Sequence, residues 1–440
     1  MTKFLEDLAA RRRFGMKPGL DTIRSVAAAL GDPQLAFKAI HVAGTNGKGA
    51  VAALLDAALR EAGERTGRYT SPHLVRLNER FVLDGLPLDD ATLERAAEKV
   101  EAAIRASEDP AVNELTFFEA LTAVAFLVYA EARCGHVVLE CGLGGRLDAT
   151  NVCTPELCVI TKIGLDHCDW LGDTVEKIAA EKAGIIKPGV PVVLARNVPE
   201  VRAVVEARAK ELGAPFFYAP ELADESEIPA DFPLAGSFNR ENAVTALAAL
   251  KVLGDILRRD STFYIRSSSF SRVLWPGRFQ RLGDVLIDGA HNPPAAEALA
   301  TALRAEDWRD LTLIAGFCGD KDTDVVLRLL APFVTRGYAV KTVNPRSLSA
   351  EETARRMSAA GIASDPAPSF AEALARARKL KSSNLKSNNH TSPSILVAGS
   401  LFLAGEAVVE LGGYPWSGET RFDPSEKLVA EEFKQKGETK

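Results

Sequence analysis

Residues 41–50, HVAGTNGKGA, combine three glycines with a lysine directly before a helix-like stretch. Gly44, Gly47 and Gly49 allow the backbone to turn so that several N–H groups point at one site, and the following helix adds its N-terminal dipole. Lys48 adds a positive charge suited to nucleotide phosphates. A glycine-rich turn with a solvated lysine is the alternative, but the flanking strand and helix favour a phosphate-binding loop. The predicted loop comprises Gly44, Thr45, Asn46, Gly47, Lys48 and Gly49.

Phosphate-binding loops usually carry serine or threonine after the lysine to bind magnesium, whereas Gly49 and Ala50 follow it here. The metal then needs oxygen ligands elsewhere, and open parallel sheets gather their ligands where strands end. Ser71, Glu140 and His167 each end or follow a strand-like run. Glu140 is the strongest candidate because a carboxylate inside VVLEC is costly to bury without a partner. A plain turn at Ser71 and a satisfied loop histidine at His167 remain open alternatives.

A second glycine-rich stretch, residues 137–149, resembles a dinucleotide-binding fingerprint. However, Leu147 stands where that pattern needs its third small residue, and Pro155 and the next strand, near Leu157, follow closely. The long helix that a dinucleotide fold places there has no room. We therefore do not expect NAD binding.

Short apolar runs alternate with helix-like stretches through most of the chain. This alternation is typical of parallel sheets covered by helices, so we predict the α/β fold class. In the N-terminal part, the expected strands are 36–44, 135–142, 156–164 and 190–195, and the expected helices are 50–63, 174–184 and 240–254, the first ending at Gly63 and the last at Gly254.

Serine, proline and glycine interrupt this pattern at residues 266–284, after a long helix. Beyond the interruption the alternation restarts, which predicts a second domain. Residues 379–394 are polar and low in complexity, which indicates a flexible surface loop. We predict a phosphate-loop ATPase-type parallel-sheet domain over residues 1–277, a linker over 278–283, a smaller Rossmann-like α/β domain over 284–420, and a charged tail over 421–440.

The composition suits a globular protein, since 47% of the 440 residues are hydrophobic and 25% are charged. The net charge of −6 gives no support for nucleic-acid binding or a polybasic membrane contact. No apolar run approaches the ~20 residues of a membrane span, and the N-terminal residues lack the apolar core of a secretory signal. The six cysteines form no CxxC pair, so we predict reduced packing residues in a cytoplasmic protein.

An ordered set of motifs resembles the folylpolyglutamate synthase and dihydrofolate synthase family, which belongs to the Mur-type, ADP-forming amide ligases. Each motif alone is modest, but together they follow the family's order from about residue 14 to about residue 410. The motifs are HVAGTNGKG, TSPHLVRLNER, LTFFEALTAVAF, VVLECGLGGRLDATN, LDHCDWLG, EKAGIIKPG, NRENAVTALAAL, WPGRFQ, DGAHNP and AGSLFLAGE.

The resemblance implies a ligase that uses ATP and Mg²⁺. A substrate carboxylate attacks the γ-phosphate of ATP to give an acyl phosphate and ADP. The amine of L-glutamate then displaces phosphate and forms an amide. Phosphorylation is needed because a carboxylate is a poor acylating agent, and magnesium with cationic side chains is needed because two anions must meet.

By the same resemblance, one magnesium lies beside the phosphate loop with Ser71 and Glu140, and a second is held by His167 and Lys182. Lys182 matches a carbamylated lysine of the family, and carbamylation turns an amine into an anionic oxygen ligand. On its sequence context alone, Lys182 would be read as a solvated helix lysine. The residues implied in catalysis are Lys48, Glu140, His167, Lys182 and Arg278.

On the nucleotide side, the resemblance implies that Asn242 lies near the adenine and that Arg278 reaches the phosphates. Asp288 and His291 are the implied contacts from the C-terminal domain, and Asp288 also ends an apolar strand. A surface charge is the alternative for Arg278, and a neighbour of a helix start is the alternative for His291. If the two domains close on one nucleotide, a nucleotide contact is favoured over these alternatives for both Arg278 and His291.

The chain departs from the family pattern at two places. The family usually has serine or threonine at the position of Ala50, and often has His-Gln where this chain has Phe238 and Asn239. We expect one phosphate or metal contact and one nucleotide contact to differ here.

The pterin side is implied by two segments, TFFE and RLDA. Phe117 and Phe118 could flank a flat ring, although helix core is the close alternative, and Asp148 could accept the ring N–H groups or orient the acyl chain. Leu20 and Asp21 are further candidates. The implied substrate residues are Thr116, Phe117, Phe118, Glu119, Leu147, Asp148 and Ala149.

Three other classes of protein are alternatives to this family. A cell-wall Mur ligase would carry a domain for a UDP sugar ahead of the loop, where only about forty residues stand here. A phosphate-loop kinase or NTPase would use the same loop, but that class does not explain a second α/β domain with Asp288 and His291 after a strand. A non-catalytic ATP-binding module does not need Glu140, His167 and Lys182 together.

We therefore expect a bifunctional enzyme that adds the first glutamate to dihydropteroate and later ones to reduced folates. The expected partners are these small molecules and L-glutamate, with no nucleic acid and no membrane. The resemblance also implies a monomer.

Overall fold

The computed structural model describes residues 3–11, 19–257, 267–319, 321–383 and 392–416. Contacts divide the chain into two units. The N-terminal unit comprises Met1–His73, Leu77–Pro233 and Asn239–Val273, and the C-terminal unit comprises Leu74–Arg76, Leu234–Phe238 and the chain from Leu274 onward.

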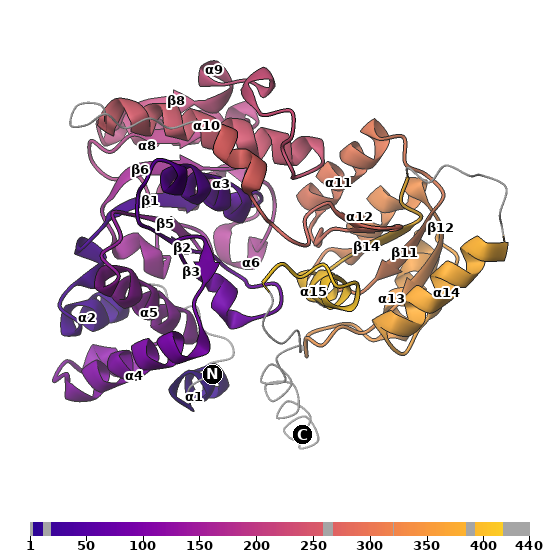
Figure 1. Cartoon of the computed structure of the whole chain (residues 1–440), viewed down its shortest axis with the longest axis horizontal. Coiled ribbons are helices and arrows are strands. Elements are labelled where there is room, and N and C mark those ends of the chain that lie inside the picture. The colour runs from indigo at the N-terminus through magenta and orange to yellow at the C-terminus, as the bar shows by residue number, and fades with distance from the viewer. Residues whose placement is uncertain (1–2, 12–18, 258–266, 320, 384–391, 417–440) are drawn as a thin grey trace. The chain divides into compact units, whose positions relative to one another are not determined.

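The N-terminal unit is built on an eight-stranded sheet with the order β4-β3-β2-β5-β1-β6-β7-β8 (Figure 1). The strands from β2 to β8 in this order are parallel, as predicted, whereas β3 and β4 form an antiparallel edge. The prediction was wrong for that edge because Asp84 and Gly85 both have positive φ, which is typical of a tight hairpin turn. The strands are β1 (Lys38–Ala43), β2 (Thr66–Tyr69), β3 (Phe81–Leu83), β4 (Leu86–Pro87), β5 (His136–Glu140), β6 (Pro155–Ile160), β7 (Val192–Leu194) and β8 (Phe216–Tyr218).

Helices cover this sheet, and α2, α4 and α5 lie together on one side of it in Figure 1. The α-helices are α1 (Lys3–Arg11), α2 (Asp21–Ala29), α3 (Lys48–Glu61), α4 (Asp90–Ala106), α5 (Phe117–Glu131), α6 (Cys168–Leu171), α7 (Val175–Ala183), α8 (Pro199–Glu211), α9 (Ala219–Leu222) and α10 (Ser237–Leu257), and the 3₁₀ helices are η1 (Pro33–Leu35), η2 (Leu77–Arg80), η3 (Pro110–Glu114), η4 (Ala149–Val152), η5 (Glu225–Glu227) and η6 (Ser267–Arg272).

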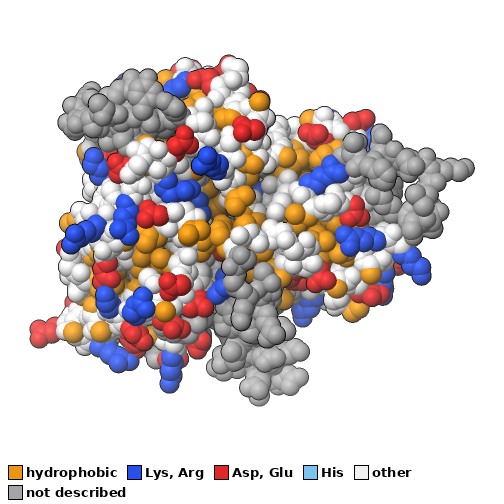
Figure 2. Space-filling model, viewed as in Figure 1, with side chains coloured by type: hydrophobic (Ala, Val, Ile, Leu, Met, Phe, Trp, Pro, Cys, Tyr) orange, Lys and Arg blue, Asp and Glu red, His pale blue; other side chains and the backbone are white. Residues whose placement is uncertain are grey.

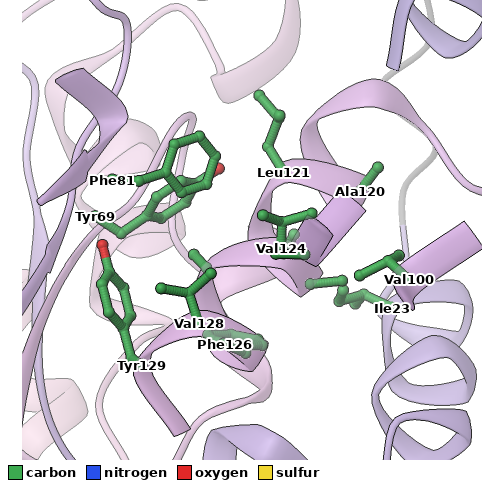
Figure 3. Close-up of a cluster of buried hydrophobic side chains, with 14 of the residues drawn as sticks. Ile23, Tyr69, Phe81, Val100, Ala120, Leu121, Val124, Phe126, Val128 and Tyr129 are labelled. Atoms are coloured by element: carbon green, nitrogen blue, oxygen red, sulfur yellow. The ribbon is translucent and has the colours of Figure 1, made fainter. Parts of the chain in front are cut away.

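Helix α5 lies at the centre of one hydrophobic core (Figure 3). Its sequence is apolar on almost every side, so it is buried between the sheet and its neighbours α2 and α4 rather than lying on the surface. The rings of Tyr69 and Phe81, with centroids 5.5 Å apart, join this core from β2 and β3. The core therefore fixes the end of β2 relative to the start of α5.

Helix α10 continues through Gly254 to Leu257, so the predicted stop at Gly254 was wrong. Val252 and Leu253 are buried, and burial of the helix outweighs the roughly 1 kcal/mol that glycine costs in a helix interior.

The C-terminal unit is built on a six-stranded sheet with the order β13-β12-β11-β14-β10-β9, in which only β9 runs antiparallel to its neighbour. The strands are β9 (Gln280–Leu282), β10 (Val285–Ile287), β11 (Leu311–Ala315), β12 (Val334–Ala339), β13 (Ser364–Pro366) and β14 (Ile395–Ala398). The helices are α11 (Pro293–Ala305), α12 (Thr323–Leu330), η7 (Ala331–Phe333), α13 (Ala350–Ala359), α14 (Phe370–Ser383) and α15 (Leu401–Glu410).

Both faces of this second sheet are covered, as expected for a Rossmann-like fold. Leu286 of β10 belongs to a core with α11, α12 and α13, whereas Val285 and Ile287 belong to a core with α14 and α15. Successive side chains of a strand point to opposite faces, so the two cores lie on opposite sides of the sheet.

The ranges of the two units differ in detail from the predicted domain ranges. The chain changes unit between Val273 and Leu274, and residues 278–283, expected as a linker, contain strand β9. The excursion Leu74–Arg76 was not expected; Leu74 and Val75 pack in the C-terminal core, a contact that no local pattern reveals. The expected loop 379–394 begins as part of α14, and its residues 384–391 lie outside the described part, as does the predicted tail 421–440.

The distribution of charged side chains on the surface and the state of the cysteines can be compared with the expectations from composition. Figure 2 shows Lys and Arg side chains interspersed with Asp and Glu over the visible face. All six cysteines are free; five are buried, and Cys168 is exposed. None of the helices in the described ranges is long and apolar enough to cross a membrane.

Candidate active site

The loop between β1 and α3 requires glycine at two positions. Gly44 and Gly47 have φ values of 153° and 87°. A Cβ built on Gly44 would lie 1.8 Å from the Thr161 hydroxyl oxygen, and one built on Gly47 would lie 2.2 Å from Asn242 Oδ1. Asn242, expected on the nucleotide side, therefore lies directly against the loop.

The rest of the loop is held by backbone bonds to the segment after β6. The N–H groups of Thr45 and Asn46 donate to the Lys162 carbonyl at 2.9 and 3.1 Å. The Thr161 hydroxyl donates to the Asn46 carbonyl at 2.8 Å. These contacts hold the loop at the N-terminus of α3, where backbone N–H groups and the helix dipole favour an anion.

Two lysine ammonium groups meet at this loop. Lys48 Nζ donates to the carbonyls of Gly44 and Thr45 at 3.0 and 3.1 Å. Lys182 Nζ, from the last turn of α7, donates to the same Gly44 carbonyl at 2.8 Å. Lys182 is buried, so the solvated-lysine alternative is wrong. Burial, and then the charge of Lys48, lower the pKa of Lys182 to about 7.

Glu140 and Ser71 are brought together because β2 and β5 are parallel neighbours. The Ser71 N–H donates to Glu140 Oε2 at 3.1 Å, and Glu140 is buried at the end of β5. The pair presents a carboxylate and a hydroxyl, which are the hard oxygen donors that magnesium prefers. This donor set fits the predicted metal.

His167 is placed differently. It occupies a left-handed conformation, with φ of 51°, directly before α6, and its Nε2 lies 3.8 Å from Asp166 Oδ2. Within the described ranges, no three His, Cys, Asp or Glu side chains gather closely enough to hold a metal. The four predicted metal ligands thus form a Ser71–Glu140 pair, a Lys182 contact to the loop, and an exposed His167 beside Asp166.

Asp148 is buried in the turn after β5, where its two oxygens accept backbone N–H groups. Leu143 N–H donates to Oδ2 at 2.9 Å, and Thr150 N–H donates to Oδ1 at 3.1 Å. Burial raises the pKa of Asp148, while these bonds act in the opposite direction. Leu147 is half-buried beside it, and Ala149 begins η4.

The four residues of the TFFE segment have different contacts. Thr116 and Glu119 cap α5 reciprocally, with Thr116 N–H donating to Glu119 Oε2 at 2.9 Å, which gives both a structural function. Phe117 packs against the α5 core. Phe118 lies against Gly142, where a Cβ would stand 2.5 Å from its ring, and so reaches the end of β5.

The C-terminal unit gathers its predicted residues after β10. Asp288 accepts the Phe279 N–H with Oδ2 and the Ala290 N–H with Oδ1, both at 2.8 Å. A Cβ on Gly289 would lie 2.1 Å from Arg278 Nη1, so the guanidinium crosses this turn. His291 Nδ1 lies 2.7 Å from the Gly289 carbonyl, which fixes the ring. Burial raises the pKa of Asp288, and Arg278 opposes that shift.

Three polar residues near the site were not predicted from the sequence. Thr161 supports the loop, while His41 and Thr150 lie buried beside Asp148. The available signal was a histidine inside the apolar strand AIHVA, since a buried imidazole needs a hydrogen-bond partner.

Comparisons with known proteins identify two Mur ligase domains in this chain. Residues 42–198 match the Mur ligase middle domain, and residues 277–401 match the Mur ligase glutamate ligase domain. The dihydrofolate synthase/folylpolyglutamate synthase of Bacillus subtilis is 36% identical over 321 residues, which cover 67% of this chain and 74% of that protein.

Solved structures are similar over almost the whole chain. Mycobacterium tuberculosis folylpolyglutamate synthase, complexed with ADP and AMPPCP, has a TM-score of 0.81 and 32% identity, with 94% of this chain and 100% of that chain covered. The bifunctional folylpolyglutamate synthase/dihydrofolate synthase of Yersinia pestis, complexed with AMPPNP and a manganese ion, has a TM-score of 0.79 and 29% identity, with 93% and 97% covered.

Proposed function

This chain belongs to the Mur ligase family of folylpolyglutamate and dihydrofolate synthases, and we propose that the site after β1 activates a pteroate or folate carboxylate for attack by L-glutamate. The enzyme is an ATP-dependent, ADP-forming ligase. The observation that carries the site assignment is the convergence of Lys48 and Lys182 on the Gly44 carbonyl. A glycine-rich loop at a helix N-terminus with Lys48 beside it suits nucleotide phosphates, and Lys182 lies against the same loop, where a modified lysine could hold a metal ion.

Lys48 is proposed to bind the β- and γ-phosphates. Its ammonium group now donates to loop carbonyls, and it can turn to phosphate oxygens without moving the backbone. As the substrate carboxylate attacks the γ-phosphorus, the bond to the bridging oxygen breaks and ADP leaves. The glutamate amine then attacks the acyl carbon, loses a proton and displaces phosphate.

Glu140 and Ser71 are proposed to hold Mg²⁺ beside the loop, where the ion would screen the phosphates from the incoming carboxylate. The manganese ion in the Yersinia pestis relative supports a divalent ion. Lys182 is proposed to be carbamylated and, with His167, to hold a second ion. Carbamylation requires the neutral amine, and a pKa of about 7 makes that form abundant at neutral pH.

The remaining roles are proposals of the same kind. Asn242, Arg278, Asp288 and His291 are assigned to the nucleotide. Phe118 and Asp148 are assigned to the pterin and acyl portion, because they reach the end of β5, while Thr116, Phe117 and Glu119 support α5. Leu147 and Ala149 would line the same turn.

The proposal extends to a monomeric cytoplasmic enzyme that binds no nucleic acid. Six free cysteines support a reducing compartment. The mass in solution, measured by light scattering, tests the monomer.

Phosphate release from ATP tests the function. The assay contains magnesium, L-glutamate and either dihydropteroate or a reduced folate, with one component omitted at a time. Release that needs glutamate and dihydropteroate is expected for the synthase activity, and release with reduced folate for chain extension. Release without any pterin would indicate an NTPase or a ligase of another acid.

A further inference from the structure

A chain of buried polar groups links strand β1 to Asp148. His41 Nε2 lies 2.8 Å from the Thr150 hydroxyl oxygen, and that oxygen lies 2.5 Å from Asp148 Oδ1. Cys141 Sγ lies 3.1 Å from the same His41 nitrogen. His41 and Thr150 are both fully buried. The chain thus runs from the strand that carries the phosphate loop to the carboxylate assigned to the substrate.

The direction of the hydrogen bonds follows from what each group can donate. Thr150 has one hydroxyl proton, and Asp148 is the nearer acceptor, because Cys141 Sγ lies 3.7 Å away. The hydroxyl oxygen must then accept from His41 Nε2–H. Among the residues that the structure describes, His41 Nδ1 has no hydrogen-bond partner, which suits an unprotonated nitrogen better than an N–H group.

The imidazole is therefore a fixed neutral donor. Burial, and then the charge of Lys187, lower the pKa of His41 to about 3, so it stays uncharged at physiological pH. The Asp148 oxygen that faces Thr150 accepts two hydrogen bonds, one from the N–H and one from the hydroxyl. The other oxygen accepts Leu143 N–H, so the orientation of the carboxylate is fully determined.

We propose that His41 and Thr150 are positioning residues, which orient the Asp148 carboxylate toward the pterin or acyl portion of the substrate. The inference rests on the proposed function, because it takes Asp148 as a substrate contact. It also gives a reason for a histidine in an otherwise apolar strand. A purely structural role for the same bonds would affect folding but not one substrate selectively.

Two pairs of variants separate these roles. Thr150→Val removes the hydroxyl and keeps the shape, while Thr150→Ser keeps the hydroxyl. His41→Leu removes the donor, while His41→Gln retains an amide N–H that can reach Thr150. Thr353→Val, in the C-terminal unit, is the matched control, because it removes a buried hydroxyl that has no hydrogen-bond partner within the described ranges.

We expect Thr150→Val and His41→Leu to lower kcat/KM for dihydropteroate roughly tenfold, as loss of one oriented hydrogen bond would. KM for ATP should stay within about twofold of the wild-type value, since the loop itself is untouched. Thr150→Ser and His41→Gln should restore most of the loss, and Thr353→Val should match the wild type.

Equilibrium binding of dihydropteroate to the nucleotide-loaded protein completes the test, with thermal unfolding measured on every variant. If the wild type binds and Thr150→Val binds equally well, the positioning role is overturned and the proposed function stands. If ATP and dihydropteroate parameters fall together, the role is structural only and the inference is overturned. If the wild type binds no pterin, both the proposed substrate and this inference are overturned.

Discussion

The two units place polar groups at the same kind of position, after a central parallel strand, but hold them differently. In the N-terminal unit, Lys48 and Lys182 reach the loop through side chains and bind its carbonyl oxygens. In the C-terminal unit, Asp288 accepts two backbone N–H groups and is part of the turn itself.

The lysine side chains can exchange their present hydrogen-bond partner for a ligand. The Asp288 carboxylate instead holds the conformation of its own turn. An ammonium group can exchange a carbonyl for a phosphate oxygen while the backbone stays in place. A carboxylate that accepts the N–H groups of its own turn, as Asp288 does and as Asp148 does in the N-terminal unit, must meet any ligand from where it stands, because moving away would expose two buried donors. Changes in the first region should therefore affect activity more than stability, and changes in the second should affect both.

The largest effect is expected for Glu140→Gln. This variant tests whether a change at the N-terminal site affects activity more than stability. The amide can still accept the Ser71 N–H, so the unfolding temperature should stay close to that of the wild type. Loss of the negative charge should lower kcat at least about 100-fold, because the metal loses its carboxylate ligand. Glu156→Gln, at the start of β6 rather than at the carboxyl end of a strand, is the control and should stay active. Near-normal turnover of Glu140→Gln would show that the metal assignment is wrong.

A pair of glycine substitutions sharpens the comparison between the units. Gly47 and Gly283 both have positive φ, of 87° and 61°, but only Gly47 has a side chain in the way. Gly47→Ala should raise KM for ATP about tenfold or more, because either the loop or Asn242 must move. Gly283→Ala should cost only about 1 kcal/mol of stability from backbone strain, with activity unchanged. Equal effects of the two variants on KM would mean that the loop does not bind the nucleotide.

The sequence predicted the parts of this architecture that depend on local patterns. Alternating apolar runs located the central strands, and the glycines with Lys48 located the loop, because strand, turn and helix each leave a short-range signature. The antiparallel edges and the Leu74–Arg76 excursion were missed, since they depend on contacts between segments far apart in the chain.

The site shows the same division. The burial of Glu140 and its need for a partner were predictable because a carboxylate in an apolar strand is conspicuous, whereas a lysine in EKAG resembles any surface helix lysine. Only the fold buries Lys182 against Gly44, and only the fold joins His41 to Asp148 through Thr150.

Asp288→Asn tests the second half of the comparison. Asparagine keeps one acceptor oxygen, so its amide nitrogen must face the N–H of either Phe279 or Ala290. We expect the variant to lose about 1–3 kcal/mol of stability and about tenfold in kcat/KM for ATP. Thermal unfolding and steady-state kinetics on the same preparation measure both. Loss of activity at unchanged stability would mean that Asp288 acts on the ligand alone, as Glu140 is expected to do.

The smallest effect is expected at Glu406, a second carboxylate of the C-terminal unit, on α15. Its Oε1 accepts Val343 N–H at 3.1 Å, and burial raises its pKa from 4.5 to about 7. Between those values the folded chain binds more protons than the unfolded chain, so stability falls as pH rises from 4.5 to 7 and stays lower above. Glu406→Gln carries no such proton and keeps the bond to Val343. The free energy of unfolding of Glu406→Gln should match that of the wild type near pH 4.5 and exceed it by about 1–2 kcal/mol at pH 8, after discounting for partial exposure.

Glu410→Gln, on the exposed side of the same helix, is the control and should show no such pH-dependent gain in stability. Denaturant unfolding at pH 4.5 and pH 8 measures this difference in the free energy of unfolding. If the difference between Glu406→Gln and the wild type were the same at both pH values, protonation of Glu406 would not be coupled to folding. Asp288 would then be the better-supported case of a carboxylate whose burial affects the stability of this unit.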